Sequence, residues 1–245
     1  MPKIGPMAAA LASITLIVTM ASSARANNSA PQSVVMAALS AWVNGNQGKC
    51  EDLLAIDAKT YPKDQTLAFF RALCRRSRWE IGDSFPLLKY ANSLNPSSSY
   101  GKASYYIAAI DTNHDVDKNY GLLGKLCTQN PKNILLLWSA GFMSRHLERT
   151  EPKVAADRCY TGIAYYKRLE ALLHGRGSAI VHQTYGNLLD DAEQYKPALH
   201  ERLLAVKEEP MPWSLNALAN TYDELKQPAN AAKVRARLAR EFPGQ

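Results

Sequence analysis

The stretch TYGNLLDDAEQYKPALHERLLAVKEEP, residues 184–210, carries the strongest fold signal in the chain. It contains two apolar segments of helical length, separated by the polar run DDAEQ. The small residues Gly186, Ala198 and Ala205 stand 24, 12 and 5 positions before Pro210. Two helices of a hairpin approach closely only where side chains are small, and a proline ends a helix. The stretch therefore predicts a helix–turn–helix unit.

The same spacing recurs along the chain. Pro62, Pro96 and Pro131 follow one another at nearly the same interval, which also separates Pro210 from Pro243. Such a fixed period is typical of repeat proteins. Counting back from these prolines gives two columns in which small residues dominate. The column at 24 positions holds Ala38, Ala72, Ile107, Gly186 and Ala219, and the column at 12 positions holds Cys50, Ser84, Asn119, Ala198 and Ala231.

Two consecutive units share a signature of Gly or Ala, Tyr, Ala and Pro. It falls on Gly186, Tyr195, Ala198, Ala205 and Pro210, and again on Ala219, Tyr222, Ala231 and Pro243. On these residues the chain resembles the tetratricopeptide (TPR) repeat family. The resemblance implies an all-α fold, a right-handed α-solenoid of about six helix–turn–helix units, each packed on the next. One solenoid domain is expected over residues 27–245, with units at about 31–64, 65–98, 99–133, 134–178, 179–211 and 212–245.

The N-terminal segment, residues 1–26, is expected to be a cleaved signal peptide. Lys3 precedes an apolar run over residues 7–20, and the small residues of Ala24–Ala26 follow it. The alternative is an uncleaved anchor, but the run is shorter than the roughly 20 residues that span a bilayer. We expect a periplasmic or secreted protein with no integral membrane segment in its mature chain. Removing Lys3 and Arg25 lowers the formal net charge from +7 to +5.

The cysteine count is even, as expected for disulfides in an exported chain. The four cysteines are Cys50, Cys74, Cys127 and Cys159, and no C-x-x-C spacing predicts a zinc site. The repeat frame places Cys50 and Cys74 on neighbouring helices of units one and two. It places Cys127 and Cys159 on the second helices of units three and four. We predict the pairs 50–74 and 127–159; the alternative is four buried thiols.

Polar residues recur on the first helices of the last two units. Residues three and four apart share a helix face, and in the TPR family the equivalent face lines a concave groove. Amide side chains there can donate to and accept from a peptide backbone. The acidic end of each row favours a cationic or neutral extended segment; the alternative is a solvated face duplicated with the repeat. The rows are Gln183, Asn187 and Asp190 in one unit and, one repeat later, Asn216, Asn220 and Asp223.

The stretch DTNHDVDKNYG, which begins at Asp111, looks like a calcium loop. An EF-hand loop needs Gly at its sixth position and Glu at its twelfth, where this chain has Val116 and Leu122. We interpret the stretch as the helix–helix turn of unit three, with Asp115 or Asp117 capping the second helix. Calcium binding is not expected.

One residue of that stretch joins the predicted groove. Asp111 stands 20 positions before Pro131, just as Asp190 and Asp223 stand 20 positions before their own prolines. It therefore extends the polar rows by one member at the edge of the groove.

Neither catalysis nor nucleic-acid binding has a recognisable motif. The histidines are scattered, without H-E-x-x-H spacing, and G-x-S-x-G is absent. No Lys/Arg cluster is interleaved with aromatic residues, so no nucleic-acid partner is expected. We expect no enzymatic activity, no cofactor and no metal. The prediction is an exported scaffold that binds a protein or peptide partner in its groove, in a cell-envelope or secretion assembly. The alternative is an envelope enzyme or an accessory subunit of hydrolytic machinery.

Overall fold

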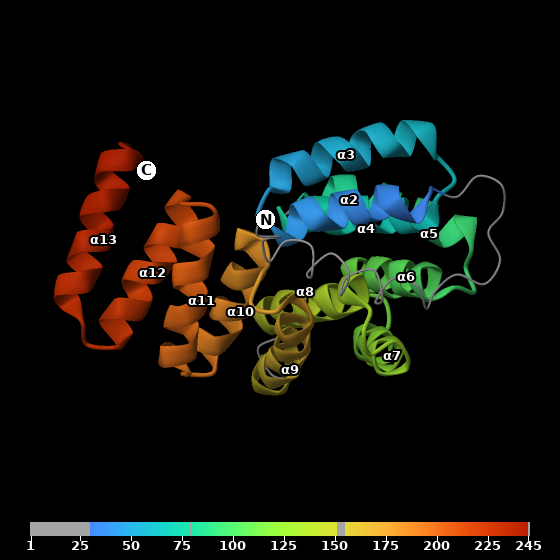
Figure 1. Cartoon of the computed structure of the whole chain (residues 1–245). Coiled ribbons are helices and arrows are strands. Elements are labelled where there is room, and N and C mark those ends of the chain that lie inside the picture. The colour runs from blue at the N-terminus through green and yellow to red at the C-terminus, as the bar shows by residue number, and fades with distance from the viewer. Residues whose placement is uncertain (1–29, 79, 151–154, 245) are drawn as a thin grey trace, which may run out of the picture. The chain divides into compact units, whose positions relative to one another are not determined.

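This computed structural model describes residues 30–78, 80–150 and 155–244. The predicted signal peptide, residues 1–26, lies outside them. The described residues form twelve α-helices and no strand (Figure 1), which confirms the all-α prediction. The helices are α2 (Gln32–Val43), α3 (Gln47–Thr60), α4 (Gln65–Ser77), α5 (Ile81–Leu94), α6 (Ser99–Asp111), α7 (Val116–Gln129), α8 (Ile134–Thr150), α9 (Ala155–Leu173), α10 (Ala179–Asp191), α11 (Tyr195–Glu208), α12 (Pro212–Glu224) and α13 (Pro228–Glu241).

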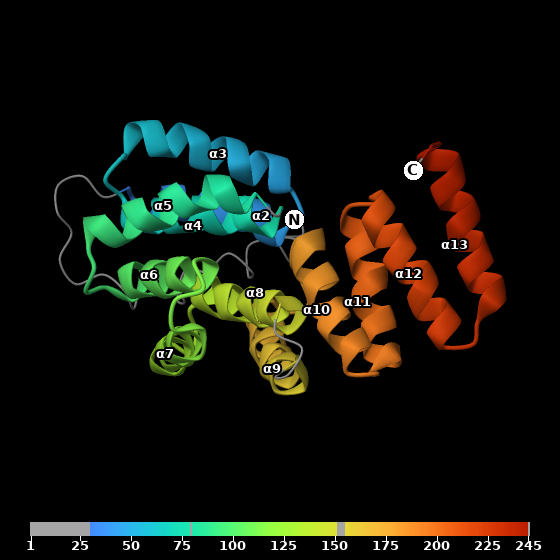
Figure 2. The ribbon, with the colours of Figure 1, turned by 180° about the vertical axis from the view of Figure 1, so that it is seen from behind.

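The helices pack in chain order, as in a TPR solenoid. Each predicted repeat contains one consecutive pair of helices. The chain divides into two compact units, the first ending at Ala140 and the second beginning at Gly141. In the first unit α2 to α7 pack on their neighbours, and in the second α9 to α13 do the same; α10 to α13 lie side by side in both views (Figures 1 and 2). That residues 27–245 form a single domain stays a prediction.

The two columns of small residues are the contact lines of the hairpins. Every member of both columns is buried. Gly186 shows how close this approach is, because a Cβ atom there would lie 3.2 Å from the guanidinium group of Arg202 on the partner helix, which would have to shift by a few tenths of an ångström. Close approach of the helices thus depends on residue size at these positions, as the sequence predicts.

The first helices of three repeats begin with the same cap. Asp64, Ser98 and Asn133 each stand two places after a repeat proline. Their side-chain oxygens accept hydrogen bonds from the backbone N–H groups three places further on, at 2.8, 2.9 and 3.1 Å. A cap of this kind contributes about 1 kcal/mol to helix stability. The proline and the cap together define where each repeat begins.

The turn between the two helices of a repeat also recurs. Gly45, Glu193 and Lys226 occupy the same repeat position, midway between the small residues of the two columns, with φ of 74°, 56° and 58°. Only glycine adopts this left-handed conformation without steric cost. Two of the three turns therefore hold a non-glycine residue in a strained backbone conformation.

The turn before α7 differs from the predicted one. Asp115 does precede α7, but its backbone is left-handed, with φ of 44°, and its side chain makes no capping hydrogen bond. Instead Asn119 Nδ2 donates to the carbonyl oxygens of His114, at 2.8 Å, and Asp115, at 3.1 Å. Asp117 lies in the first turn of α7. The expected cap by Asp115 is wrong: its backbone is left-handed, and its carboxylate contacts Lys118 Nζ at 3.6 Å instead of a backbone N–H.

Aromatic and aliphatic residues form the core of each unit. In the first unit the Trp42 ring lies 4.5 Å from that of Trp138, and Phe70 meets both edge-on. In the second unit, Val206, Leu215, Leu218 and Leu238 form an apolar cluster between α11, α12 and α13. None of the helices in the described ranges is both long and apolar enough to cross a membrane.

Candidate functional site

The predicted row on α10 is tied to an arginine of α11. Arg202 Nη2 donates to Asp190 Oδ2 at 2.5 Å and to Asn187 Oδ1 at 2.8 Å. Its Nη1 donates to the carbonyl oxygen of Gln183 at 3.0 Å. The guanidinium is buried, with 3% of the side chain exposed. One arginine thus binds the side chains of Asn187 and Asp190 and the backbone of Gln183, whose side-chain oxygen has no hydrogen-bond partner.

The same arrangement recurs one repeat later. Arg235 takes the repeat position of Arg202, as Asp223 takes that of Asp190, and the two form an ion pair. The Nη2 atom of Arg235 also approaches Asn220 Oδ1 at 3.4 Å. Arg235 is half exposed, whereas Arg202 is buried.

The two rows differ in their access to solvent. On α10, Gln183 is 9% exposed, and Asp190 also accepts a hydrogen bond from Thr221 of α12 at 3.2 Å. This row therefore faces the next repeat. On α12, Asn216 and Asn220 are exposed, and no described helix follows α13. Within the second unit, a partner could reach the α12 row, where Asn216 and Asn220 are exposed and 41% of the Asp223 side chain is exposed.

Burial and charge compete at the Asp190 site. Burial raises the pKa of the Asp190 carboxyl above its usual value, although Arg202 and Thr221 act in the opposite direction. Burial also lowers the pKa of Arg202. Because each aspartate of the rows is already paired with an arginine, the rows offer little negative charge to a cationic segment.

Asp111 forms a buried ion pair in the first unit. Both of its carboxylate oxygens accept hydrogen bonds from the guanidinium of Arg76 on α4. Only 2% of the Arg76 side chain and 4% of the Asp111 side chain are exposed. Bidentate pairs of this type are geometrically specific. The structure thus gives Asp111 a role in joining α4 to α6.

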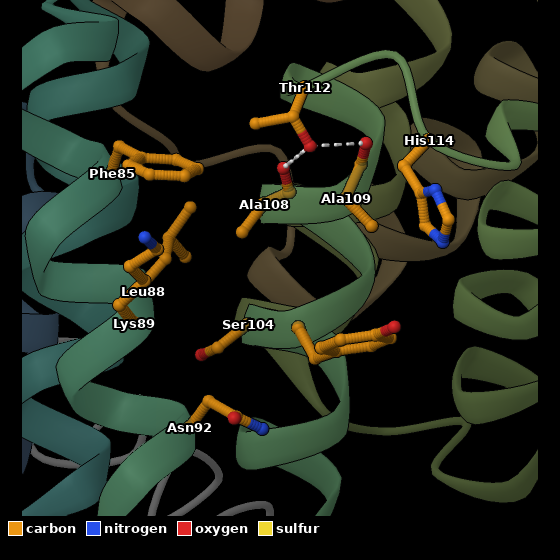
Figure 3. Close-up of a pocket in the computed structure, with 10 residues that line it drawn as sticks. Phe85, Leu88, Lys89, Asn92, Ser104, Ala108, Ala109, Thr112 and His114 are labelled. Carbon is orange, nitrogen blue, oxygen red and sulfur yellow. Dashed lines mark hydrogen bonds between the residues drawn. The ribbon is translucent and has the colours of Figure 1, made fainter.

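A pocket of about 380 Å³ lies between α5 and α6 (Figure 3). Two of its residues, Ser104 and Ala108, stand 27 and 23 positions before Pro131. These are the repeat positions of Gln183 and Asn187 on α10. In repeat three the predicted groove face therefore opens into a pocket. The lining residues are Phe85, Leu88, Lys89, Asn92, Ser104, Tyr105, Ala108, Ala109, Thr112 and His114.

The pocket has mainly apolar walls and few available polar groups. Thr112 Oγ1 donates within α6, to the carbonyl oxygens of Ala108 and Ala109, both at 3.1 Å (Figure 3). Asn92 Nδ2 donates to the carbonyl oxygen of Gly101 at 2.9 Å. In contrast, the Ser104 hydroxyl is fully buried and has no hydrogen-bond partner. Because none of its surface is exposed, this hydroxyl cannot bond a ligand in the pocket in this conformation.

One lysine gives the pocket a positive charge. Lys89 Nζ lies 4.7 Å from the centroid of the Phe85 ring, a cation–π contact. The Lys89 side chain belongs to an exposed residue of α5. The α5 side of the pocket was not predicted, because no repeat column marks Phe85 or Lys89. On the α6 side, Ser104 and Ala108 stand at the repeat positions of the rows, but without the polar pattern that marks them in the last two units.

No disulfide joins the four cysteines, all of which are in the described residues. The hydrogen bond between Cys74 and Cys50, then burial, raises the pKa of the Cys74 thiol well above its usual range, so these two groups are neighbours on α3 and α4. Cys127 Sγ donates to the Leu136 carbonyl at 3.3 Å, and Cys159 Sγ donates to the Leu188 carbonyl at 2.9 Å. Both disulfide pairs stay predictions.

One group among the described residues has metal-binding side chains close together. The ligand atoms of Glu170 on α9 and of His200 and Glu201 on α11 all lie within 4.8 Å of one another. The sequence gives no hint of this group, because its members come from two helices that another helix, α10, separates along the chain.

Comparison with solved structures gives the fold assignment. A structure of MamA AMB-1 superposes with a TM-score of 0.52 at 14% identity, over 74% of this chain and 93% of MamA. A monomeric mutant of IFIT1 with Gppp-AAAA superposes with a TM-score of 0.55 at 13% identity, over 79% of this chain. Both are TPR-repeat proteins. The protein has a TPR-like fold.

The TPR-like fold is shared with these proteins, but the chain spans only 46% of the length of IFIT1. A scan against protein-family models finds no match, and neither does a comparison with curated protein sequences. At this level of identity the likeness concerns the fold alone. Function must therefore be argued from the residues of the site.

Proposed function

We propose that this TPR-like protein is an exported scaffold that binds an extended segment of a protein partner, as part of a cell-envelope or secretion assembly. The observation that carries the proposal is the pocket between α5 and α6, which opens at the repeat positions of the predicted groove. Its mainly apolar walls support occupation by an apolar side chain of the bound segment.

The pocket favours a large apolar side chain of the bound segment. Its volume of about 380 Å³ and its walls of Phe85, Leu88 and Ala108 suit an aromatic or long aliphatic residue. Of the described residues that line the pocket, Lys89 is the one Lys, Arg, Asp or Glu. Its positive charge favours a peptide with an acidic residue next to the apolar one.

The structural comparison supports a scaffold in a general way. TPR-repeat proteins are generally non-catalytic scaffolds for protein interactions, and the proposal includes the absence of chemistry. The IFIT1 structure holds Gppp-AAAA, so the fold also occurs in a protein with a nucleotide ligand. That this chain has a protein partner and binds no nucleic acid is therefore a part of the proposal that needs its own test.

Export rests on the N-terminal sequence. Fractionation of cells that express the full chain should place it outside the cytoplasm, and N-terminal sequencing should give Asn27 as the first residue. Recovery of the protein with an intact N-terminus in the cytoplasm would contradict this part of the proposal and leave the binding pocket untouched.

Binding is best tested with defined peptides. Selection from a random peptide library on the tag-free protein should enrich an aromatic or aliphatic residue next to Asp or Glu. Fluorescence anisotropy should then show at least 10-fold weaker binding by Ala108→Leu, which fills the pocket, and by Lys89→Glu, which reverses its charge. Lys125→Glu, an exposed lysine of α7 away from the pocket, is the matched control.

Two outcomes would contradict the proposal. Peptides that bind Ala108→Leu as tightly as the unchanged protein would show that the pocket is not the site. Oligonucleotide binding in place of any peptide binding, measured in the same assay, would show that the class of partner is wrong. Peptide binding by Asn220→Ala, measured in the same assay, tests separately whether the exposed row of α12 takes part in binding.

A further inference from the structure

We propose that Glu170, His200 and Glu201 form a binding site for a divalent transition-metal ion, with Zn²⁺ as the reference metal. One imidazole nitrogen and two carboxylate oxygens make a mixed donor set of the kind that zinc accepts. Calcium and magnesium prefer sites made entirely of oxygen ligands. This site lies in the second unit and is separate from the peptide pocket.

A buried histidine holds one of the carboxylates in place. His182 on α10 lies between the two helices that carry the ligands, and its Nδ1 is 2.8 Å from Glu201 Oε2. Only 4% of each of these two side chains is exposed. The contact fixes the Glu201 carboxylate and leaves Oε1 available to a metal. Metal ligands in proteins are commonly oriented by such a second hydrogen-bonded group.

The two carboxylates of the group, Glu170 and Glu201, favour a bound cation. Glu170 and Glu201 bring carboxylate oxygens within 4.8 Å of each other. Within the described ranges, neither carboxylate forms an ion pair with Lys or Arg; Glu201 instead contacts the His182 ring. A bound divalent ion would neutralise both carboxylates.

The group can close around a metal with small side-chain movements. A tetrahedral zinc with bonds of about 2.0–2.2 Å needs ligand atoms about 3.4 Å apart. The present separations, up to 4.8 Å, are therefore too long by at most about 1.4 Å. Glu201 is buried and fixed, whereas His200 is exposed and Glu170 is partly exposed, so the latter two can move. Three protein ligands leave a fourth position for water or for a side chain of a partner.

The experiment is a zinc titration of tag-free protein by isothermal calorimetry, with metal content measured after dialysis. One Zn²⁺ per chain is expected, and the zinc-bound protein should have a raised Tm. His200→Gln and Glu170→Gln should each weaken binding at least 10-fold and abolish the Tm shift. Circular dichroism checks that these two variants, at exposed and partly exposed positions, remain folded.

Three control variants test whether zinc binds elsewhere: two change a histidine and a glutamate of the same unit outside the group, and one changes a cysteine. His174→Gln, an exposed histidine outside the group, and Glu224→Gln, an exposed glutamate of α12, should bind zinc like the unchanged protein. Cys50→Ser should also bind normally, because thiols are the competing zinc ligands. The proposal is overturned if the protein takes up no zinc from a tenfold molar excess, if His200→Gln binds as tightly as the unchanged protein, or if Cys50→Ser loses the metal.

Discussion

Arg76 and Asp111 occupy the same position in successive repeats and form a buried ion pair between α4 and α6. Each stands 20 positions before a repeat proline. In the second unit, the aspartates at this position pair with arginines of the following helix instead, Asp190 with Arg202 and Asp223 with Arg235. The column that looked like the edge of a groove is thus a column of ion pairs with different burial.

Asp111→Ala should be strongly destabilising. It removes the carboxylate that both Nη atoms of the buried Arg76 guanidinium bond, and breaking a buried ion pair typically costs about 3–5 kcal/mol. Asp223→Ala removes the same column residue from an exposed pair and should have an effect near the limit of measurement. Urea unfolding monitored by circular dichroism compares the two. Similar losses from both variants would contradict the assigned burial.

Replacing both partners of the buried pair should recover stability. Buried ion pairs can often be exchanged for apolar residues of similar volume without net loss. The double variant Arg76→Met/Asp111→Leu should therefore be more stable than Asp111→Ala in the same urea titration. A double variant less stable than the single one would show that the pair does more than neutralise buried charge.

Lys226→Gly should stabilise the protein by about 1 kcal/mol, because glycine removes the steric cost of the left-handed backbone at φ 58°. Lys233→Gly, at an exposed position inside α13, should instead destabilise it by about 1 kcal/mol. Opposite shifts in Tm are the expected result. Equal destabilisation by both glycines would mean that residue 226 is not left-handed in solution.

Gly101→Ala should be destabilising through a direct clash. A Cβ atom at residue 101 would lie 2.0 Å from the carbonyl oxygen of Asn95, so the start of α6 would have to move away from α5. Overpacking of this kind costs about 1–3 kcal/mol. Gly48→Ala, in α3 with no atom within 4 Å of the added methyl group, is the control and should be neutral or stabilising. Thermal unfolding of both variants is the measurement. An equal Tm for the two variants would contradict the close approach of residue 101 to the Asn95 carbonyl oxygen.

The Cys50–Cys74 pair should form a disulfide when the protein is exported. The two thiols are neighbours on α3 and α4, and the bond would stabilise the fold by about 3 kcal/mol in the chain-entropy model. Peptide mapping without reduction should recover a peptide that links these two cysteines. A peptide that links Cys50 to Cys127 would contradict the predicted pairing.

The repeat architecture was predictable because helix packing within a repeat requires particular residue types at fixed positions of the sequence. Small residues at fixed distances from each proline mark the contact lines of the hairpins, and all ten column members are buried. The N-terminal caps recur with the same period. These features depend on residues within one repeat, so a single sequence is enough to show them.

The surroundings of the predicted groove residues were not predictable in the same way. The row on α10 looked available because its bonding partner, Arg202, lies on another helix, at a repeat position that holds leucine in the first three units. The pocket in repeat three is made by small residues, Ser104 and Ala108, so it shows no polar pattern. Likewise, Glu170 meets His200 and Glu201 only through helix packing.

The central claim is that a protein partner binds at the pocket between α5 and α6. Replacing Tyr105, an exposed residue of the pocket, with a photo-crosslinking amino acid tests this directly in the native cell. The account predicts a crosslinked protein that disappears when excess library-selected peptide competes in lysed cells, and no such product from the same substitution at exposed Tyr160 of α9. The same products at both positions, or products that the peptide does not displace, would contradict it.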